Sequence, residues 1–151
     1  MADYTPVALP GQTYTFTAGG TITGGDLVEI SAANTVIKTV TLASTLYIGV
    51  AGHDATTGGK VTVTLGKVIH ESVADGTITA GQQLTTTNTA NRQVKALAAT
   101  AVNVDVTASP TEASIEAFNG AINTAVNNAR AIIGVAISTA TDNQTVRWAQ
   151  R

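Results

Sequence analysis

Two short segments of this chain are repeated in the same order, and this repeat limits the folds that the chain can adopt. The sequence Ile-Gly-Val-Ala occurs at residues 48–51 and again at residues 133–136. The sequence Thr-Ile-Thr precedes it each time, at residues 21–23 and 77–79. The order is preserved, while the spacing between the two segments is larger in the second copy. The chain is therefore predicted to be a tandem of two related units, the second of which carries an insertion.

The surroundings of the longer repeat also correspond. Val61 and Val63 follow the first copy at the same offsets at which Val146 and Trp148 follow the second copy. Residues two apart on a strand point to the same face, so each pair is expected on one face of a strand. The glycine within each copy stands in mid-strand, where it marks a bulge, a bend or the close approach of another backbone.

Most of the chain consists of short β-rich segments separated by glycine and asparagine, such as TYTFT, DLVEIS, TVIKTV and KVTVTL. Many short strands at close spacing favour an all-β fold, a small antiparallel β-barrel or β-tulip-like domain built from two related β units. We expect a single β domain over residues 12–151, preceded by an extended N-terminal arm at residues 1–11. A single barrel and two small packed barrels both fit the two halves.

The insertion has the sequence signals of a helix. Ser109 is expected to cap the helix, with Pro110 at the first helical position and Glu112 at the spacing of a capping box. The helix is predicted at about 110–129, inside an insertion at about 99–130.

One side of this predicted helix is apolar. Ile115, Phe118, Ile122 and Val126 follow one another at intervals of three and four residues. Such a stripe more often packs on the barrel of its own chain than on another chain. If it faces another molecule instead, Phe118, Ile122 and Trp148 are the residues that we expect at an oligomer or shell interface.

The composition argues against several classes of partner. Charged residues make up 12% of the chain, the formal net charge is −2, and the eight Lys and Arg are scattered. A nucleic-acid-binding surface needs clustered cations and, for single strands, aromatic platforms, so no nucleic acid partner is expected. No apolar run approaches the roughly 18 residues of a membrane span, so no membrane partner is expected. The start of the chain lacks the pattern of a signal peptide, which predicts synthesis in the cytoplasm.

The chain offers few candidates for catalysis or metal binding. His70 and Glu71 are adjacent on a predicted strand, so their side chains should point to opposite faces and cannot act on one atom. His53 and Asp54 could bind a metal with a third ligand, but the second copy has no such pair, which favours a solvated turn. The chain contains no cysteine, and no cofactor motif is present. We therefore interpret it as a binding or structural protein and not as an enzyme.

The pattern of glycine, threonine and aliphatic residues resembles a known family. The residues that carry the resemblance are GQTYTFTAGGTITGGDLVEI, LYIGVAGHDATTGGKVTV, TITAGQQLTTT and IIGVAISTATDNQTVRW, after an arm with Pro6 and Pro10. Together they are similar to the small capsid decoration, or cement, proteins of tailed bacteriophages, a group long catalogued as a domain of unknown function in phage head gene clusters. The resemblance covers about residues 10–97 and 130–150, and the predicted helix departs from the compact members.

The resemblance implies a protein of the virion that is added to the outer surface of the mature phage head. Such proteins commonly sit as homotrimers at three-fold and quasi-three-fold sites and stabilise the shell without catalysis or cofactors. The implied partners are the major capsid protein and further copies of this chain. A capsid-binding arm would pair with the shell through its main chain, and it comprises Ala2, Asp3, Tyr4, Thr5, Pro6, Val7, Ala8, Leu9 and Pro10.

Two alternatives remain at the level of sequence. A virion-associated carbohydrate- or receptor-binding β module would use exposed Asn, Gln and Thr, with Trp148 or Tyr47 as a platform for a sugar ring. A cytoplasmic enzyme would have to bring His53, Asp54 or His70 together in a concave site.

Overall fold

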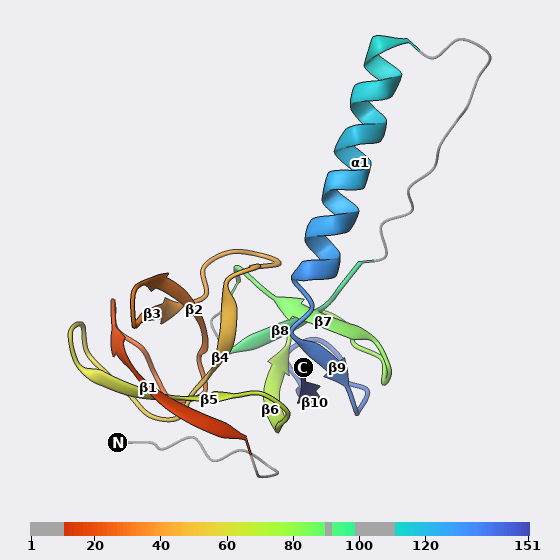
Figure 1. Ribbon diagram of the computed structural model, residues 1–151. Helices are drawn as coiled ribbons and strands as arrows, with labels where there is room; N and C mark the ends of the chain where they lie inside the picture. The colour runs from red at the N-terminus through yellow and green to blue at the C-terminus, as the bar shows by residue number, and fades with distance from the viewer. Residues whose placement is uncertain (1–10, 90–91, 99–110) are drawn as a thin grey trace.

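The computed structural model describes residues 11–89, 92–98 and 111–151, and this part of the chain forms two closed five-stranded barrels and one helix (Figure 1). The first barrel contains β1 (Gln12–Ala18), β2 (Leu27–Ala32), β3 (Thr35–Lys38), β4 (Tyr47–Ala51) and β5 (Lys60–Leu65). The second contains β6 (Ile69–Ala74), β7 (Gln83–Thr86), β8 (Gln93–Ala96), β9 (Gly134–Ala136) and β10 (Thr145–Gln150). The all-β class is confirmed, and the two halves form two packed barrels.

The two barrels have the same topology. In the first, the strands are ordered β1-β3-β2-β4-β5, and the ring closes because β1 pairs with β5. In the second, the order β6-β8-β7-β9-β10 closes through β6 and β10. Each barrel contains one parallel pair, β1 with β3 and β6 with β8, among otherwise antiparallel pairs. The tandem prediction is confirmed, and the predicted antiparallel pairing is observed at every pair except these two.

The turn before the second strand is built identically in each barrel. Gly25 and Gly81 adopt positive φ values of 88° and 89°, which glycine tolerates because it lacks a Cβ. The N–H of Gly25 donates to the carbonyl of Ala51, and the N–H of Gly81 donates to the carbonyl of Ala136, each at 2.8 Å. The segments that begin with Thr-Ile-Thr are therefore bonded to the Ile-Gly-Val-Ala strands within each unit.

The glycine in each Ile-Gly-Val-Ala strand lies against the backbone of the next strand. A Cβ at Gly49 would overlap the carbonyl oxygen of Thr64 in β5, and a Cβ at Gly134 would overlap that of Ala149 in β10. Of the possibilities for a mid-strand glycine, close approach of another backbone is thus the one observed at both positions. Both barrels therefore have a small residue at the same packing point.

The apolar cores of the barrels are joined. The core of the second barrel includes Trp148, Leu84 and Ile78, and Leu27 and Val50 from the first barrel belong to the same cluster. A separate cluster fills the first barrel around Phe16, Ile22, Val36, Val61 and Val63. Because two fully buried residues of β2 and β4 pack into the neighbouring core, the barrels adhere through apolar contact.

A loop from the first barrel crosses to the second. Between β3 and β4, the N–H of Ser44 donates to Thr86 Oγ1 at 2.8 Å, and the same hydroxyl donates to the carbonyl of Thr41 at 2.9 Å. The N–H of Ala43 donates to the carbonyl of Thr86 at 3.2 Å. Thr86 in β7 is itself buried, so this loop is fixed on the second barrel.

The helix α1 (Glu112–Arg130) stands away from both barrels (Figure 1). Its N-cap is Thr111, whose side chain accepts a hydrogen bond from the N–H of Ser114 at 3.3 Å. The prediction of Ser109 as the cap is therefore wrong, and Ser109 and Pro110 lie outside the described residues. No residue of α1 is buried, so the expectation that its apolar stripe packs on its own barrel is also wrong.

Candidate interaction surfaces

The strand that carries His70 and Glu71 separates these two side chains, as the sequence predicted. His70 is fully buried inside the second barrel, with its Nε2 2.9 Å from Gln150 Oε1. Burial lowers the pKa of the His70 imidazole, and the hydrogen bond with Gln150 opposes this shift. Glu71 lies on the outer face and accepts a hydrogen bond from Arg147 Nε at 2.8 Å. The two residues therefore serve the core and the surface of the barrel, and they do not form a catalytic pair.

His53 holds the backbone of the neighbouring strand. Its Nε2 accepts a hydrogen bond from the N–H of Thr62 at 3.1 Å. In the second barrel, Ser138 Oγ accepts a hydrogen bond from the N–H of Arg147 at 2.9 Å. His53 and Ser138 thus accept the same backbone hydrogen bond in the two barrels. Because the two residue types differ, their equivalence is hard to recognise in the sequence.

Asp54 has an equivalent in the second barrel as well. Its Oδ1 accepts a hydrogen bond from the N–H of Gly24 at 2.8 Å, and Thr139 Oγ1 accepts one from the N–H of Ala80 at 3.2 Å. The view that residues 53 and 54 lie outside the repeated design is therefore wrong, because their hydrogen bonds recur with other residue types. Within the described ranges, no group of three or more His, Asp or Glu could hold a metal ion.

Trp148 belongs to the core and not to a surface. Its side chain is fully buried, and its Nε1 donates a hydrogen bond to Ser72 Oγ at 2.9 Å. Its expected place at an oligomer or shell interface is thus wrong for this chain, as is its use as a sugar platform. Tyr47, the other platform candidate, is partly buried and packs against the core of the second barrel.

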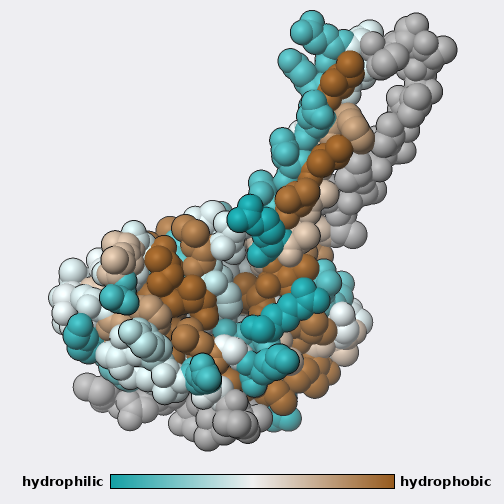
Figure 2. All heavy atoms as spheres, in the orientation of Figure 1, coloured by the Kyte–Doolittle hydropathy of each residue, from teal (hydrophilic) through white to brown (hydrophobic). Residues whose placement is uncertain are grey.

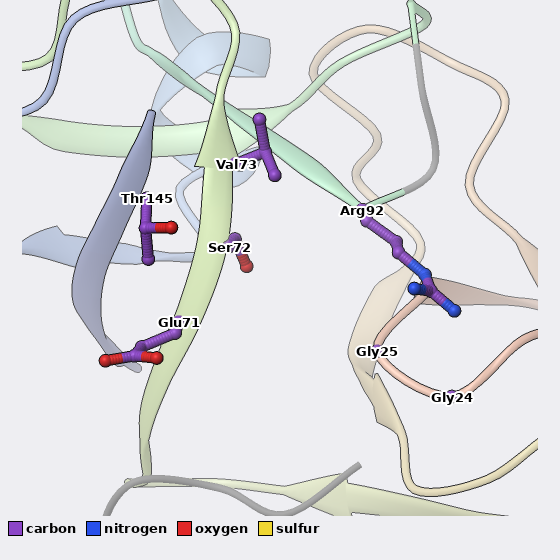
Figure 3. Close-up of a pocket in the computed structure, with 7 residues that line it drawn as sticks. All are labelled: Gly24, Gly25, Glu71, Ser72, Val73, Arg92 and Thr145. Carbon is purple, nitrogen blue, oxygen red and sulfur yellow. The ribbon is translucent and has the colours of Figure 1, made fainter. Parts of the chain in front are cut away.

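A shallow cleft opens between the barrels (Figure 3). Its volume is about 280 Å³, and its lining residues are Gly24, Gly25, Glu71, Ser72, Val73, Arg92 and Thr145. Arg92 reaches across toward the loop of the first barrel, where its Nε lies 3.4 Å from Asp26 Oδ1. Glu71 is bonded to Arg147. Arg92 and Glu71 each form an ion pair within the chain, and the pair of Arg92 with Asp26 joins the two barrels across this cleft.

Of the eight large apolar side chains that are exposed in the described residues, six lie on two elements, and the other two are Tyr14 and Ile137. The first is the helix stripe, which we define as Ile115, Phe118, Ile122 and Val126. Figure 2 shows hydrophobic side chains in a line along α1, beside hydrophilic ones. The exposed fractions are 48% for Ile115, 37% for Ile122 and 51% for Val126.

The second exposed apolar group is the loop patch, which we define as Val40, Leu42 and Leu46. All three are about half exposed, although the loop itself is fixed on β7. Exposed apolar side chains on a fixed loop are typical of an interaction surface. This surface was not predicted from the sequence, in which Thr41 separates Val40 from Leu42 and three small residues separate Leu42 from Leu46.

The predicted capsid-binding arm, residues 2–10, lies outside the described residues, and its role stays a prediction. The described chain starts at Gly11, directly before β1. The one helix that the described residues contain is not long and apolar enough to cross a membrane.

The fold defines this chain as a tandem of two five-stranded barrels with a projecting helix. No family model and no curated protein matches its sequence. Its structure is similar to a solved one, the head fiber gp8.5 N base of bacteriophage phi29, with a TM-score of 0.54 and 15% identity. The match covers 94% of this chain and 95% of that chain. At this identity the likeness establishes a shared fold, which extends through both barrels.

Proposed function

We propose that this chain is a structural protein of a bacteriophage head, a decoration protein that binds the outer surface of the mature shell. The observation that carries the proposal is the likeness of fold, over nearly the whole of both chains, to a protein of the phi29 head fiber. The sequence also resembles phage decoration proteins. In this proposal the protein acts as trimers at three-fold and quasi-three-fold sites and stabilises the shell.

The roles of the reactive side chains support a structural function. His70 fills the core of the second barrel, while His53 and Asp54 hold backbone groups of the first. Each of these residues makes a hydrogen bond within its own barrel. The proposal therefore assigns the chain no catalysis and no cofactor.

Stabilisation of a shell needs binding that favours the assembled lattice. A protein that binds the mature lattice and not its separated subunits stabilises that lattice by mass action. When many copies each bridge neighbouring capsomers, their individually weak contacts together stabilise the shell. In this proposal the major capsid protein is the partner, and the arm at residues 2–10 adds an extended strand to it.

The proposal is tested by heating undecorated heads with and without the purified protein and following DNA release with a dye. We expect saturating protein to raise the temperature of release. A variant that lacks residues 2–10 should keep its barrels, because β1 begins at Gln12, yet lose this effect. Equal release temperatures with and without the full-length protein would refute the stabilising function, and full activity of the shortened chain would refute the role of the arm.

A further inference from the structure

The helix α1 is an exposed element that needs a partner. It has 19 residues and none is buried, so the barrels do not stabilise it through packing. Most helical stability in proteins comes from burying an apolar face against another element. Gly120 and the four asparagines at 119, 123, 127 and 128 lower the intrinsic helix propensity further. The apolar face is therefore the means by which α1 can be stabilised.

The geometry of that face fits another helix. With 3.6 residues per turn, the helix stripe and Ala129 fall within about 80° of arc. The spacing from Ile115 to Phe118 to Ile122 is that of the core positions in a coiled coil, which continues through Ala125 and Ala129. Val126 and Ala121 border these positions, so the apolar face is wider than a two-helix seam requires.

The helix stripe itself contains no charged residue, so it does not select a charged partner. The two acidic residues, Glu112 and Glu116, lie near one end, and Arg130 lies at the other. Glu116 is turned about 120° from the middle of the stripe. An uncharged face of this kind is complementary to a second copy of itself, because neither side leaves a charge buried without a partner.

The base of the helix is fixed, so its direction is the same in every copy. Ala131 directly after α1 is buried, and the N–H of Ile133 donates to the carbonyl of Leu84 in β7 at 2.9 Å. Two residues further along β7, Thr86 holds the loop that carries the loop patch. These two attachment points lie about 7 Å apart along the strand. The loop patch therefore stands beside the helix base.

We propose that α1 is the self-association element of this protein, and that helices from neighbouring copies pack in parallel through the helix stripe. The parallel direction rests on the proposed function, because copies bound in one orientation on a shell project their helices side by side. A stable interface covers about 800 Å² per partner, and an aromatic side chain contributes about 150–250 Å². The short stripe supplies only part of this area, so association is concentration-dependent in solution and strengthens where a shell holds the copies together.

Disulfide trapping tests this arrangement directly, since the natural chain has no cysteine. Ile115→Cys places a thiol near the free end of the stripe, where only parallel helices bring equal positions together. The matched control Ala117→Cys places one on the opposite side of the same turn, and both positions are exposed. With oxidised glutathione, we expect Ile115→Cys to form covalent dimers roughly tenfold faster or more, as an increased effective concentration requires. Equal rates for the two variants would overturn the proposal.

A second variant tests the contact without an added thiol. Ile122→Asp puts a charge in the middle of the stripe at an exposed position, so the barrels should retain their melting temperature. Light scattering over a concentration series should show association for the natural chain and only monomers for Ile122→Asp. Equal masses at all concentrations would contradict the proposal.

The two proposals can fail separately. If the protein binds heads but Ile115→Cys forms no disulfide on them or in solution, self-association through α1 is refuted while head binding stands. If the disulfide forms in solution but the protein ignores heads, the proposed function fails while the contact between helices stands.

Discussion

The substitution Gly134→Ala tests the reason for the repeated Ile-Gly-Val-Ala segment. A methyl group at this position would overlap the carbonyl oxygen of Ala149, and it would lie 2.6 Å from Cε3 of the buried Trp148 ring. Neither neighbour is a flexible side-chain end, because one is backbone and the other is a packed ring. The three-residue strand β9 must therefore shift, although it pairs with both β7 and β10.

The expected cost follows from these contacts. Overpacking of a well-packed core costs about 1–3 kcal/mol, and the loss of one backbone hydrogen bond adds about 1 kcal/mol. The free energy of unfolding should thus fall by about 2–4 kcal/mol, which corresponds to a fall in melting temperature of about 4–16 °C for a chain of this size. Thermal unfolding followed by circular dichroism measures this difference.

Gly20→Ala is the matched control, because an added Cβ there has no atom within 4 Å. Its melting temperature should stay near that of the natural chain, since surface substitutions usually change stability by about 0.5 kcal/mol or less. If Gly134→Ala had the same melting temperature as Gly20→Ala and the natural chain, close backbone approach would not be the reason for the glycine in the repeated segment.

Two further predictions concern the core of the second barrel. Ser72→Ala leaves the buried Nε1 of Trp148 without its 2.9 Å acceptor, so urea unfolding should show a loss of about 1–3 kcal/mol, and an unchanged midpoint would refute this role. Because burial lowers the pKa of His70 from its usual 6.5, the unfolded chain binds this proton first as the pH falls. The free energy of unfolding should therefore decrease below pH 6.5, and His70→Phe should flatten this part of the profile. A profile with the same slope in both proteins would contradict that assignment.

The sequence predicted the tandem fold because the repeat and the strand alternation are local signals. Val63 and Trp148 hold equivalent positions in the two barrels, and both are fully buried. The interface role expected for Trp148 overlooked this correspondence. The parallel pairs could not be predicted in this way. Alternation states which face of a strand is buried, but it does not state the direction of the neighbouring strand.

The helix illustrates a second limit. Its apolar spacing predicted an amphipathic helix near the observed residues, but periodicity shows only that a face is apolar and not what covers it. The cap was misplaced by two residues because threonine, like serine, is a favoured N-cap residue, and the observed cap is Thr111. Residues 53 and 54 accept hydrogen bonds from the backbone, and so do residues 138 and 139 in the second barrel. The residue types differ, so this equivalence could not be recognised from the sequence.

The central claim is that this protein binds the outside of a phage head, and sedimentation tests it most directly. Increasing amounts of the purified chain are mixed with undecorated heads, the heads are pelleted, and the ratio of bound chain to major capsid protein is measured. The proposal predicts that this ratio rises to a fixed plateau, at three copies of this chain per occupied three-fold site. A chain that stays in the supernatant at every concentration, or that pellets without reaching a plateau, would contradict it.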